Sequence, residues 1–148
     1  MSNFFDTVDP TILQSYIFWS SVLVLKMNIM SILTAMKRFA KKAFANPEDA
    51  PKGTKVVLSD PDVERIRRAH QNDLESILPF FVMGFLYMFT NPSVVLATNL
   101  FRTVAIARIA HTLVYAVFVV PQPARALAWM IGFLCTGFMA VKTILAFL

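Results

Sequence analysis

The side chains best suited to bind a ligand or take part in a reaction are arginines that lie in or beside long apolar stretches. These are Arg38, Arg65, Arg68, Arg108 and Arg125. A guanidinium group stays charged at physiological pH and can bind a carboxylate through two parallel hydrogen bonds. Set against one acid, Glu75, these groups supply more positive charge than is needed to hold helices together. The excess predicts a binding site for an anionic ligand.

Helical spacing places several of these polar side chains on common faces. Arg68, Asn72 and Glu75 stand at positions i, i+4 and i+7, which form one stripe of a helix. Arg108 and Tyr115 are also spaced i, i+7, so they share a face of a later helix. We therefore expect both stripes to face one site.

The chemistry of such a site depends on the anion that it binds. An elongated anion with several carboxylates suits a cluster of guanidinium groups. If the anion also carries a thiol, cationic surroundings lower the thiol pKa from its usual value of about 8.5. A shift of two to three pKa units corresponds to about 3–4 kcal/mol of thiolate stabilisation. Glutathione has both features, but other anionic metabolites and lipid headgroups also fit these residues.

A simpler interpretation is that these polar groups form a network that joins helices, with Glu75 neutralising an arginine. Lys26, in the middle of an apolar stretch, is interpreted as a structural or subunit-contact group. Lys142 is assigned no role because its long side chain can extend to the membrane surface. His70 and His111 are expected to form hydrogen bonds rather than act as bases. The excess of arginine over acid favours the ligand site.

Four apolar stretches could position these side chains within a membrane. They lie at about 11–35, 74–90, 94–120 and 126–148, in a chain of 148 residues that is 57% hydrophobic and 16% charged. About 20 apolar residues in helix cross a hydrocarbon core. Because so little polar sequence remains to cover a soluble core, we predict an all-α fold, a four-transmembrane-helix bundle. Residues 1–148 are predicted to form a single integral membrane domain, with spans at about 11–38, 61–90, 94–120 and 124–148.

Composition excludes several other classes of protein. The single cysteine, Cys135, rules out an intrachain disulfide framework, and the two histidines are too far apart in sequence for a local metal site. The net charge of +5 comes largely from a loop of mixed charge without a nucleic-acid-binding motif. We therefore expect neither a metal nor a nucleic-acid partner.

Loop charges predict the orientation of the bundle. Most lysines and arginines fall in or beside the loop of residues 39–60, whereas the connection at 90–93 has none. Two acids, Asp6 and Asp9, precede the first span. Basic loops stay on the cytosolic side of a membrane. We therefore expect the 39–60 loop and the candidate site to face the cytosol.

Two proline-containing segments predict helix starts in this loop. Asn46 and Asp60 each precede a proline and at least one acid, a pattern typical of an N-cap followed by proline at the first helical position. From the second start a helix would run for roughly 29 residues, or about 43 Å, into the second span. Pro79 lies within it and is expected to bend it.

Four segments of the sequence resemble signature stretches of one known family. They are KKAFANPEDA at 41–50, DPDVERIRRAHQNDLESILP at 60–79, ARIAHTLVYAV at 107–117 and PQPARAL at 121–127. In order and spacing they resemble the MAPEG family, the membrane-associated proteins of eicosanoid and glutathione metabolism. The resemblance covers nearly the whole chain. It is greater to the microsomal glutathione transferase members than to the prostaglandin E synthase members.

The resemblance implies a homotrimer in which glutathione binds in clefts between neighbouring protomers. It assigns Arg125 the role of holding the glutathione sulfur as thiolate, and Asp49 a role in prostaglandin isomerisation. The second substrate is implied to be hydrophobic or lipid-derived and to enter from the bilayer lipids. The implied location is the endoplasmic reticulum membrane, with the mitochondrial outer membrane as an alternative. The implied glutathione contacts are Arg38, Arg68, His70, Asn72, Glu75, Arg108, Tyr115 and Arg125.

Departures from the family pattern help to choose between activities. Prostaglandin E synthase members carry a serine beside the catalytic arginine and an arginine in the second helix, where this chain has Ala126 and Gln71. Ala50 replaces the stress-sensing cysteine of the transferase members. We therefore predict a glutathione transferase with peroxidase activity toward hydrophobic electrophiles and lipid hydroperoxides. The alternative is glutathione-dependent isomerisation of prostaglandin H to prostaglandin E. A more remote alternative is a non-catalytic lipid-binding scaffold.

Overall fold

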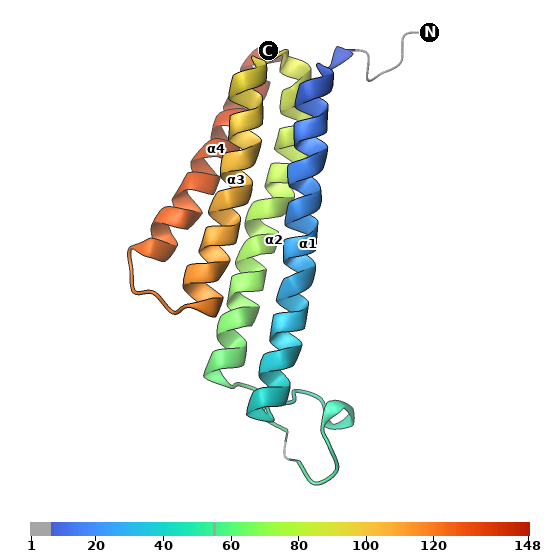
Figure 1. Ribbon diagram of the computed structural model, residues 1–148, viewed down its shortest axis with the longest axis vertical. Helices are drawn as coiled ribbons and strands as arrows, with labels where there is room; N and C mark the ends of the chain where they lie inside the picture. The colour runs from blue at the N-terminus through green and yellow to red at the C-terminus, as the bar shows by residue number, and fades with distance from the viewer. Residues whose placement is uncertain (1–6, 55) are drawn as a thin grey trace.

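The computed structural model describes residues 7–54 and 56–148, and four long helices run antiparallel through it (Figure 1). Each helix is long and apolar enough to cross a membrane. The predicted all-α fold with four membrane-length helices is therefore confirmed. Asp6, which contributed to the predicted orientation, lies outside the described residues. The helices are α1 (Pro10–Lys41), α2 (Pro61–Tyr87), α3 (Val94–Thr112) and α4 (Ala124–Ala146).

Short irregular helices connect or extend these elements. One 3-10 turn, η2 (Pro47–Asp49), lies in the loop between α1 and α2, and another, η3 (Met88–Thr90), extends α2. A π-helical segment, η4 (Leu113–Val117), extends α3. The bundle end that carries the loop of residues 42–60 is called the loop end below. Figure 1 shows that α1 and α2 reach further toward this end than α3 and α4.

Aspartate side chains define where two of the long helices begin. The Oδ1 atom of Asp9 accepts a hydrogen bond from the backbone N–H of Thr11 at 2.8 Å. The Oδ1 atom of Asp60 accepts one from Asp62 at 2.9 Å, which confirms the helix start predicted there. Each aspartate satisfies N–H groups that have no partner within the first helical turn.

The helix start predicted at Asn46 is confirmed in its position, with Pro47 as the first helical residue, but Asn46 provides no side-chain cap. The Asn46 side chain makes no capping hydrogen bond to the backbone, and only the three-residue turn η2 follows it. Its Nδ2 atom instead donates to Oδ2 of Asp49 at 2.9 Å. The helix starting beyond Asp60 does form, and it continues through Pro79. Its length agrees with the sequence prediction because apolar residues extend well beyond the proline.

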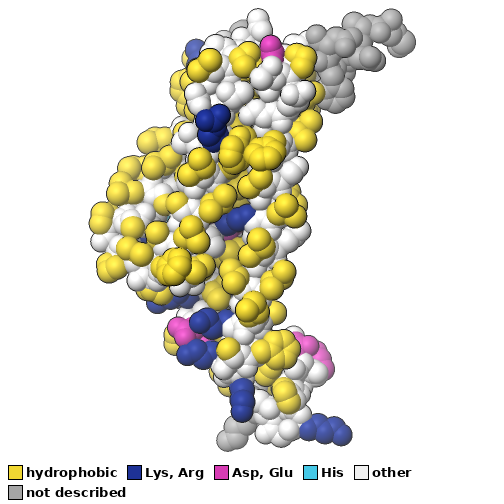
Figure 2. All heavy atoms as spheres, in the orientation of Figure 1, with side chains coloured by type: hydrophobic (Ala, Val, Ile, Leu, Met, Phe, Trp, Pro, Cys, Tyr) yellow, Lys and Arg dark blue, Asp and Glu magenta, His cyan; other side chains and the backbone are white. Residues whose placement is uncertain are grey.

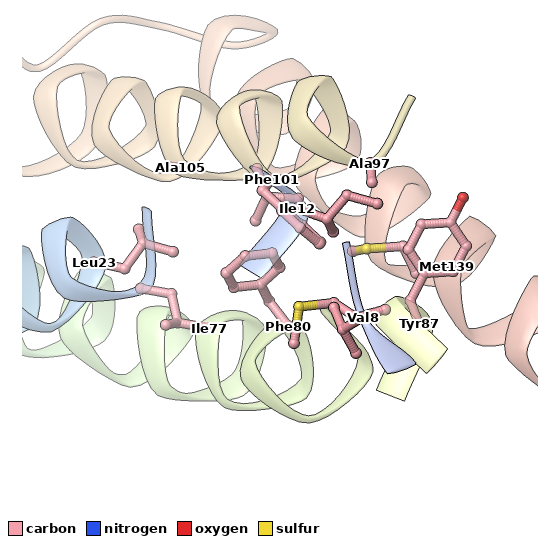
Figure 3. Packing of buried hydrophobic residues seen from close by; sticks show 12 residues of the cluster. Val8, Ile12, Leu23, Ile77, Phe80, Tyr87, Ala97, Phe101, Ala105 and Met139 are labelled. Carbon is pink, nitrogen blue, oxygen red and sulfur yellow. The ribbon is translucent and has the colours of Figure 1, made fainter. Parts of the chain in front are cut away.

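Aliphatic and aromatic side chains together form the apolar core in the half of the bundle away from the loop, and Figure 3 shows part of this packing. The Tyr16 ring from α1 packs edge-on against Phe101 of α3, with ring centroids 5.6 Å apart. The Tyr16 hydroxyl donates to the carbonyl oxygen of Phe81 at 2.7 Å. Gly84 permits this approach, because a Cβ atom there would lie 3.1 Å from the Tyr16 ring. This half is therefore held by packing rather than by charge.

The outside of the bundle is apolar over most of its length. Hydrophobic side chains cover the flanks in Figure 2, whereas charged side chains gather toward the loop end. Large apolar residues such as Phe18 and Leu134 are more than half exposed. Such a surface suits lipid rather than water.

Candidate functional site

A cleft of about 440 Å³ opens where α2, the end of α3 and the start of α4 meet, and we call it the arginine cleft. It lies toward the loop end, where the polar stripe of α2 faces the 113–126 region. Its walls combine cationic, amide and aromatic groups. They are formed by Arg68, Gln71, Asn72, Glu75, His111, Tyr115, Gln122, Arg125, Ala126 and Trp129.

Two guanidinium groups from different helices meet at one tyrosine in this cleft. The Nε atom of Arg68 donates a long hydrogen bond of 3.4 Å to the Tyr115 hydroxyl. The Arg125 guanidinium carbon lies 4.5 Å from the centre of the Tyr115 ring, a cation–π contact. Among residues 7–54 and 56–148, neither guanidinium forms an ion pair. Both charges therefore remain available to an anion.

The end of α3 positions the tyrosine. Tyr115 lies in the π-helical segment η4, where each turn holds more residues than in an α-helix. Its ring packs edge-on against His111, with centroids 5.6 Å apart. The i, i+7 spacing of Arg108 and Tyr115 was interpreted with the periodicity of a regular α-helix. The π-helical geometry was therefore not predicted.

The cleft has a net positive lining. Glu75 is the one carboxylate among its lining residues, and its Oε1 atom accepts a hydrogen bond from Gln71 at 3.2 Å. Arg125 and Ala126 belong to the first turn of α4, where the helix dipole also favours negative charge. An anion with more than one carboxylate is the ligand that this lining suits.

A second polar cluster, which we call the buried network, joins α1, α2 and α3 beside the cleft. Lys26 forms an ion pair with Oδ2 of Asp73, and Nη2 of Arg108 pairs with Oδ1 of Asp73 at 2.7 Å. Asp73 is fully buried, and Arg108 is 1% exposed. The same Nη2 atom donates to Oδ1 of Asn72 at 2.8 Å and lies 3.3 Å from Nδ1 of His111.

The buried network revises the charge count made from the sequence. Arg108 is not an unpaired arginine, because it forms an ion pair with Asp73, whose single negative charge it shares with Lys26. Lys26 was interpreted as a structural or subunit-contact group, and its ion pair with the same carboxylate agrees with a structural role. Sequence reasoning missed Asp73, although an acid within an apolar helix that faces basic residues on other helices is the signal that could have found it.

The remaining predicted site residues lie elsewhere in the chain. His70 lines a separate cleft of about 500 Å³ on another side of α2, which Arg68 and Gln71 also border. Arg38 donates from Nη1 to the Ala43 carbonyl oxygen at 3.3 Å, near the end of α1. Asp49 is exposed in η2. Within one chain, the arginine cleft therefore lacks these three side chains.

Fold and cleft together define an integral membrane protein of four helices with a cationic cleft near one end. The MAPEG family model matches residues 16–145, so the chain belongs to the MAPEG family.

Curated relatives of two kinds are similar to it. Microsomal glutathione S-transferase 1 from Bos taurus is 41% identical over 148 residues, covering 96% of this chain and 95% of that protein. Prostaglandin E synthase from Bos taurus is 38% identical over 141 residues, covering 94% and 92%. Prostaglandin E synthase from Homo sapiens is 46% identical over 105 residues, covering 70% and 69%.

Two of the three sequence departures noted above fall in the arginine cleft. Both Gln71 and Ala126 line it, beside Glu75 and Arg125 respectively. Gln71 holds Glu75 through a neutral hydrogen bond. Ala126 offers no hydroxyl group next to Arg125. The differences from the prostaglandin E synthase pattern thus lie in the cleft itself rather than at a distance from it.

Proposed function

We propose that this protein is a membrane-bound, glutathione-dependent transferase and peroxidase that binds glutathione in the arginine cleft. The observation that carries the proposal is that Arg68 and Arg125 meet at Tyr115 and that neither has an ion-pair partner within residues 7–54 and 56–148. The names of the relatives, glutathione S-transferase and prostaglandin E synthase, support an enzyme of this kind.

In this proposal Arg68 and Arg125 have different roles. Arg68 binds a glutathione carboxylate, and Arg125 holds the sulfur as thiolate in partly desolvated surroundings. The catalytic contribution is positioning and electrostatic stabilisation of charge that the cleft is already arranged to receive. Asn72 and His111, both held by Arg108, supply further hydrogen bonds in the cleft.

The sulfur then reacts with a hydrophobic partner in one of two ways. With an electrophilic carbon, the thiolate forms a carbon–sulfur bond and the leaving group departs with the bonding electrons. With a lipid hydroperoxide, the thiolate attacks one oxygen, the O–O bond breaks, and the alcohol leaves after taking up a proton. The resulting glutathione sulfenic acid condenses with a second glutathione to give the disulfide and water.

The assembly in the proposal is a homotrimer in which a neighbouring protomer completes each site. Support comes from Arg38, His70 and Asp49, which do not line the arginine cleft of their own chain. The separate cleft beside His70 shows that α2 presents polar surface on two sides. An elongated tripeptide placed between two chains could reach both kinds of surface.

The proposed location is the endoplasmic reticulum membrane, with the loop end and the arginine cleft facing the cytosol. The charged side chains gathered toward that end support this orientation under the positive-inside rule. Soluble glutathione would then enter from the cytosol, and the hydrophobic substrate from the bilayer.

The direct test is glutathione binding followed by activity. Purified protein in detergent should bind glutathione in calorimetry and show thiolate absorbance on mixing. It should then turn over a chlorodinitroarene and a lipid hydroperoxide faster than it isomerises prostaglandin H. Absence of glutathione binding would reject the proposal and favour a lipid-binding scaffold.

A second candidate function is isomerisation of prostaglandin H to prostaglandin E. The observation in its favour is the similarity of up to 46% identity to prostaglandin E synthases. Asp49 would then contribute from a neighbouring protomer. An Asp49→Ala variant that loses isomerase activity alone would establish this function, whereas an unchanged variant would exclude that role for Asp49.

A further inference from the structure

A groove of about 390 Å³ lies at the end of the bundle opposite the loop, and we call it the lysine groove. Figure 1 shows that the α2–α3 connection and the last turns of α4 meet at this end. Both segments line the groove, which is formed by Tyr87, Thr90, Asn91, Pro92, Ser93, Leu96, Lys142, Leu145 and Ala146. None of these residues lines the arginine cleft, so the two are separate features of the molecule.

Among the described residues, Lys142 is the one charged group that lines the lysine groove. It is exposed, and it forms no ion pair within residues 7–54 and 56–148. Ionisable groups in membrane helices normally face the bundle interior or a water-filled cavity. Lys142 instead lies on the outer surface of α4, so a partner for its charge must come from the surroundings.

The position of Lys142 along α4 places its ammonium group near the lipid headgroups. The 23 residues of α4 span roughly 35 Å, close to the thickness of a hydrocarbon core. Lys142 lies about 6 Å along the axis from Ala146, the last residue of the helix. A lysine side chain is long enough to carry its charge over that distance to the membrane surface. Headgroup phosphates are therefore within its reach.

The α2–α3 turn supplies uncharged polar groups beside this lysine. Asn91 takes a left-handed backbone conformation, with φ of 52°. The Thr90 hydroxyl donates to the carbonyl oxygen of Tyr87 at 2.8 Å. The Oγ atom of Ser93 accepts from the backbone N–H of Leu96 at 3.3 Å. These local bonds hold the turn in place, while the Asn91 amide and the Ser93 hydroxyl are exposed and can donate to a ligand.

Apolar side chains flank these polar groups and favour a lipid over a soluble anion. Leu96 of α3 and Leu145 of α4 line the groove and are exposed. An acyl chain that packs along them buries apolar surface, which a free inorganic anion cannot do. None of the described lining residues is an acid, so an amine in the headgroup would find no partner. A headgroup with negative charge and no amine therefore complements the groove.

We propose that the lysine groove binds a phospholipid with an anionic, amine-free headgroup, such as phosphatidylinositol, in the leaflet opposite the loop end. The phosphate accepts hydrogen bonds from Lys142, Asn91 and Ser93, and an acyl chain lies along Leu96 and Leu145. The lipid site does not depend on the proposed glutathione function, because it uses no residue of the arginine cleft.

The test locates the lipid by photo-crosslinking in nanodiscs of phosphatidylcholine that contain a trace of photoreactive phosphatidylinositol. Peptide mass spectrometry of the wild-type protein should find label at 87–96 and 142–148. Excess unlabelled phosphatidylinositol should abolish this label, whereas the same concentration of inorganic phosphate should not. Lys142→Gln should reduce it about tenfold, because a charge-assisted contact to the phosphate is lost. Label at the basic loop end should stay unchanged and serves as the internal control.

Arg102→Gln is the matched control variant. Arg102 is an exposed residue of α3 that does not line the lysine groove, and this substitution also removes one positive charge. Label in the groove should then equal that of the wild-type protein. Lys142→Arg, which keeps a cation at the groove, should also retain the label.

Four results would overturn the assignment. Unchanged label in Lys142→Gln would show that the lysine does not hold the lipid. An equal loss of label in Arg102→Gln would show a response to net charge rather than to the groove. Competition by inorganic phosphate would indicate an anion site without a role for the acyl chains. An altered number of subunits in Lys142→Gln, measured by native mass spectrometry, would show that a second copy of the chain covers the groove instead.

Discussion

The arginine cleft and the buried network use the same chemical groups for different purposes. In the buried network, Lys26 and Arg108 share the carboxylate of Asp73. In the cleft, Arg68 and Arg125 contact the neutral Tyr115. An arginine in a membrane helix is therefore structural or available to a ligand according to whether another helix supplies a carboxylate.

The two regions should differ in what they contribute to stability and to activity. Removing one member of a buried ion pair leaves an uncompensated charge out of contact with water, which is strongly destabilising. Removing an arginine from the open cleft leaves no such charge behind. Variants in the network should therefore lower the free energy of unfolding, whereas variants in the cleft should impair glutathione chemistry.

The largest expected effect is on stability, in Asp73→Ala. The substitution leaves Lys26 and Arg108 buried without their carboxylate, so we expect a loss of about 3–5 kcal/mol. Thermal unfolding in detergent measures it. The control is Glu64→Ala, which removes the exposed Glu64–Arg67 pair and should cost about 1 kcal/mol or less. Equal melting temperatures for the two variants would contradict the structural role of the network.

The next effect is on turnover, in Arg125→Ala. If this guanidinium holds the glutathione sulfur as thiolate, kcat should fall about 100-fold, as when one donor to a developing anion is lost. Folding and assembly should remain intact, which size-exclusion chromatography can check. Thiolate absorbance on adding glutathione should also fall. Unchanged absorbance in this variant would remove Arg125 from its proposed role.

A smaller effect on binding is expected for Arg68→Ala. Losing a charge-assisted contact to a carboxylate should raise the KM for glutathione about tenfold. The value of kcat should change less, because this contact is present both before and during reaction. Arg68→Lys should recover part of the affinity. A fall in kcat at unchanged KM would place Arg68 in the chemical step instead.

The smallest effect is expected for Tyr115→Phe. It removes the long hydrogen bond from Arg68 but keeps the ring that Arg125 covers, so glutathione affinity should fall by only about two- to threefold. Tyr115→Leu also removes the ring and should have the larger effect. If both variants behave alike in calorimetry, the cation–π contact does not position Arg125.

Much of the fold could be predicted because its signals are local. Backbone groups in a membrane must be hydrogen-bonded within the segment, so a long apolar run indicates a helix. The cap at Asp60 depends on residues within one turn and was predicted for that reason. The stripe of Arg68, Asn72 and Glu75 also follows from helical periodicity, and all three line the cleft.

Other features depend on contacts between helices. Periodicity shows that Arg108 lies on one face of α3, but it does not show that Asp73 lies opposite. Asp73 directly follows Asn72 in the chain, and both side chains accept a hydrogen bond from Nη2 of Arg108. Asn72 lines the cleft, while Asp73 contacts α1 and α3 through Lys26 and Arg108.

By itself, the sequence determined that the chain forms membrane-length helices and that its polar segments carry more base than acid. Both properties follow from hydropathy and composition, which can be read from the sequence without knowing which helices are in contact. Only the tertiary structure decided which bases are neutralised and which remain available. The reason is that an ion pair requires two side chains within a few ångströms, and here the relevant partners come from helices far apart in the chain.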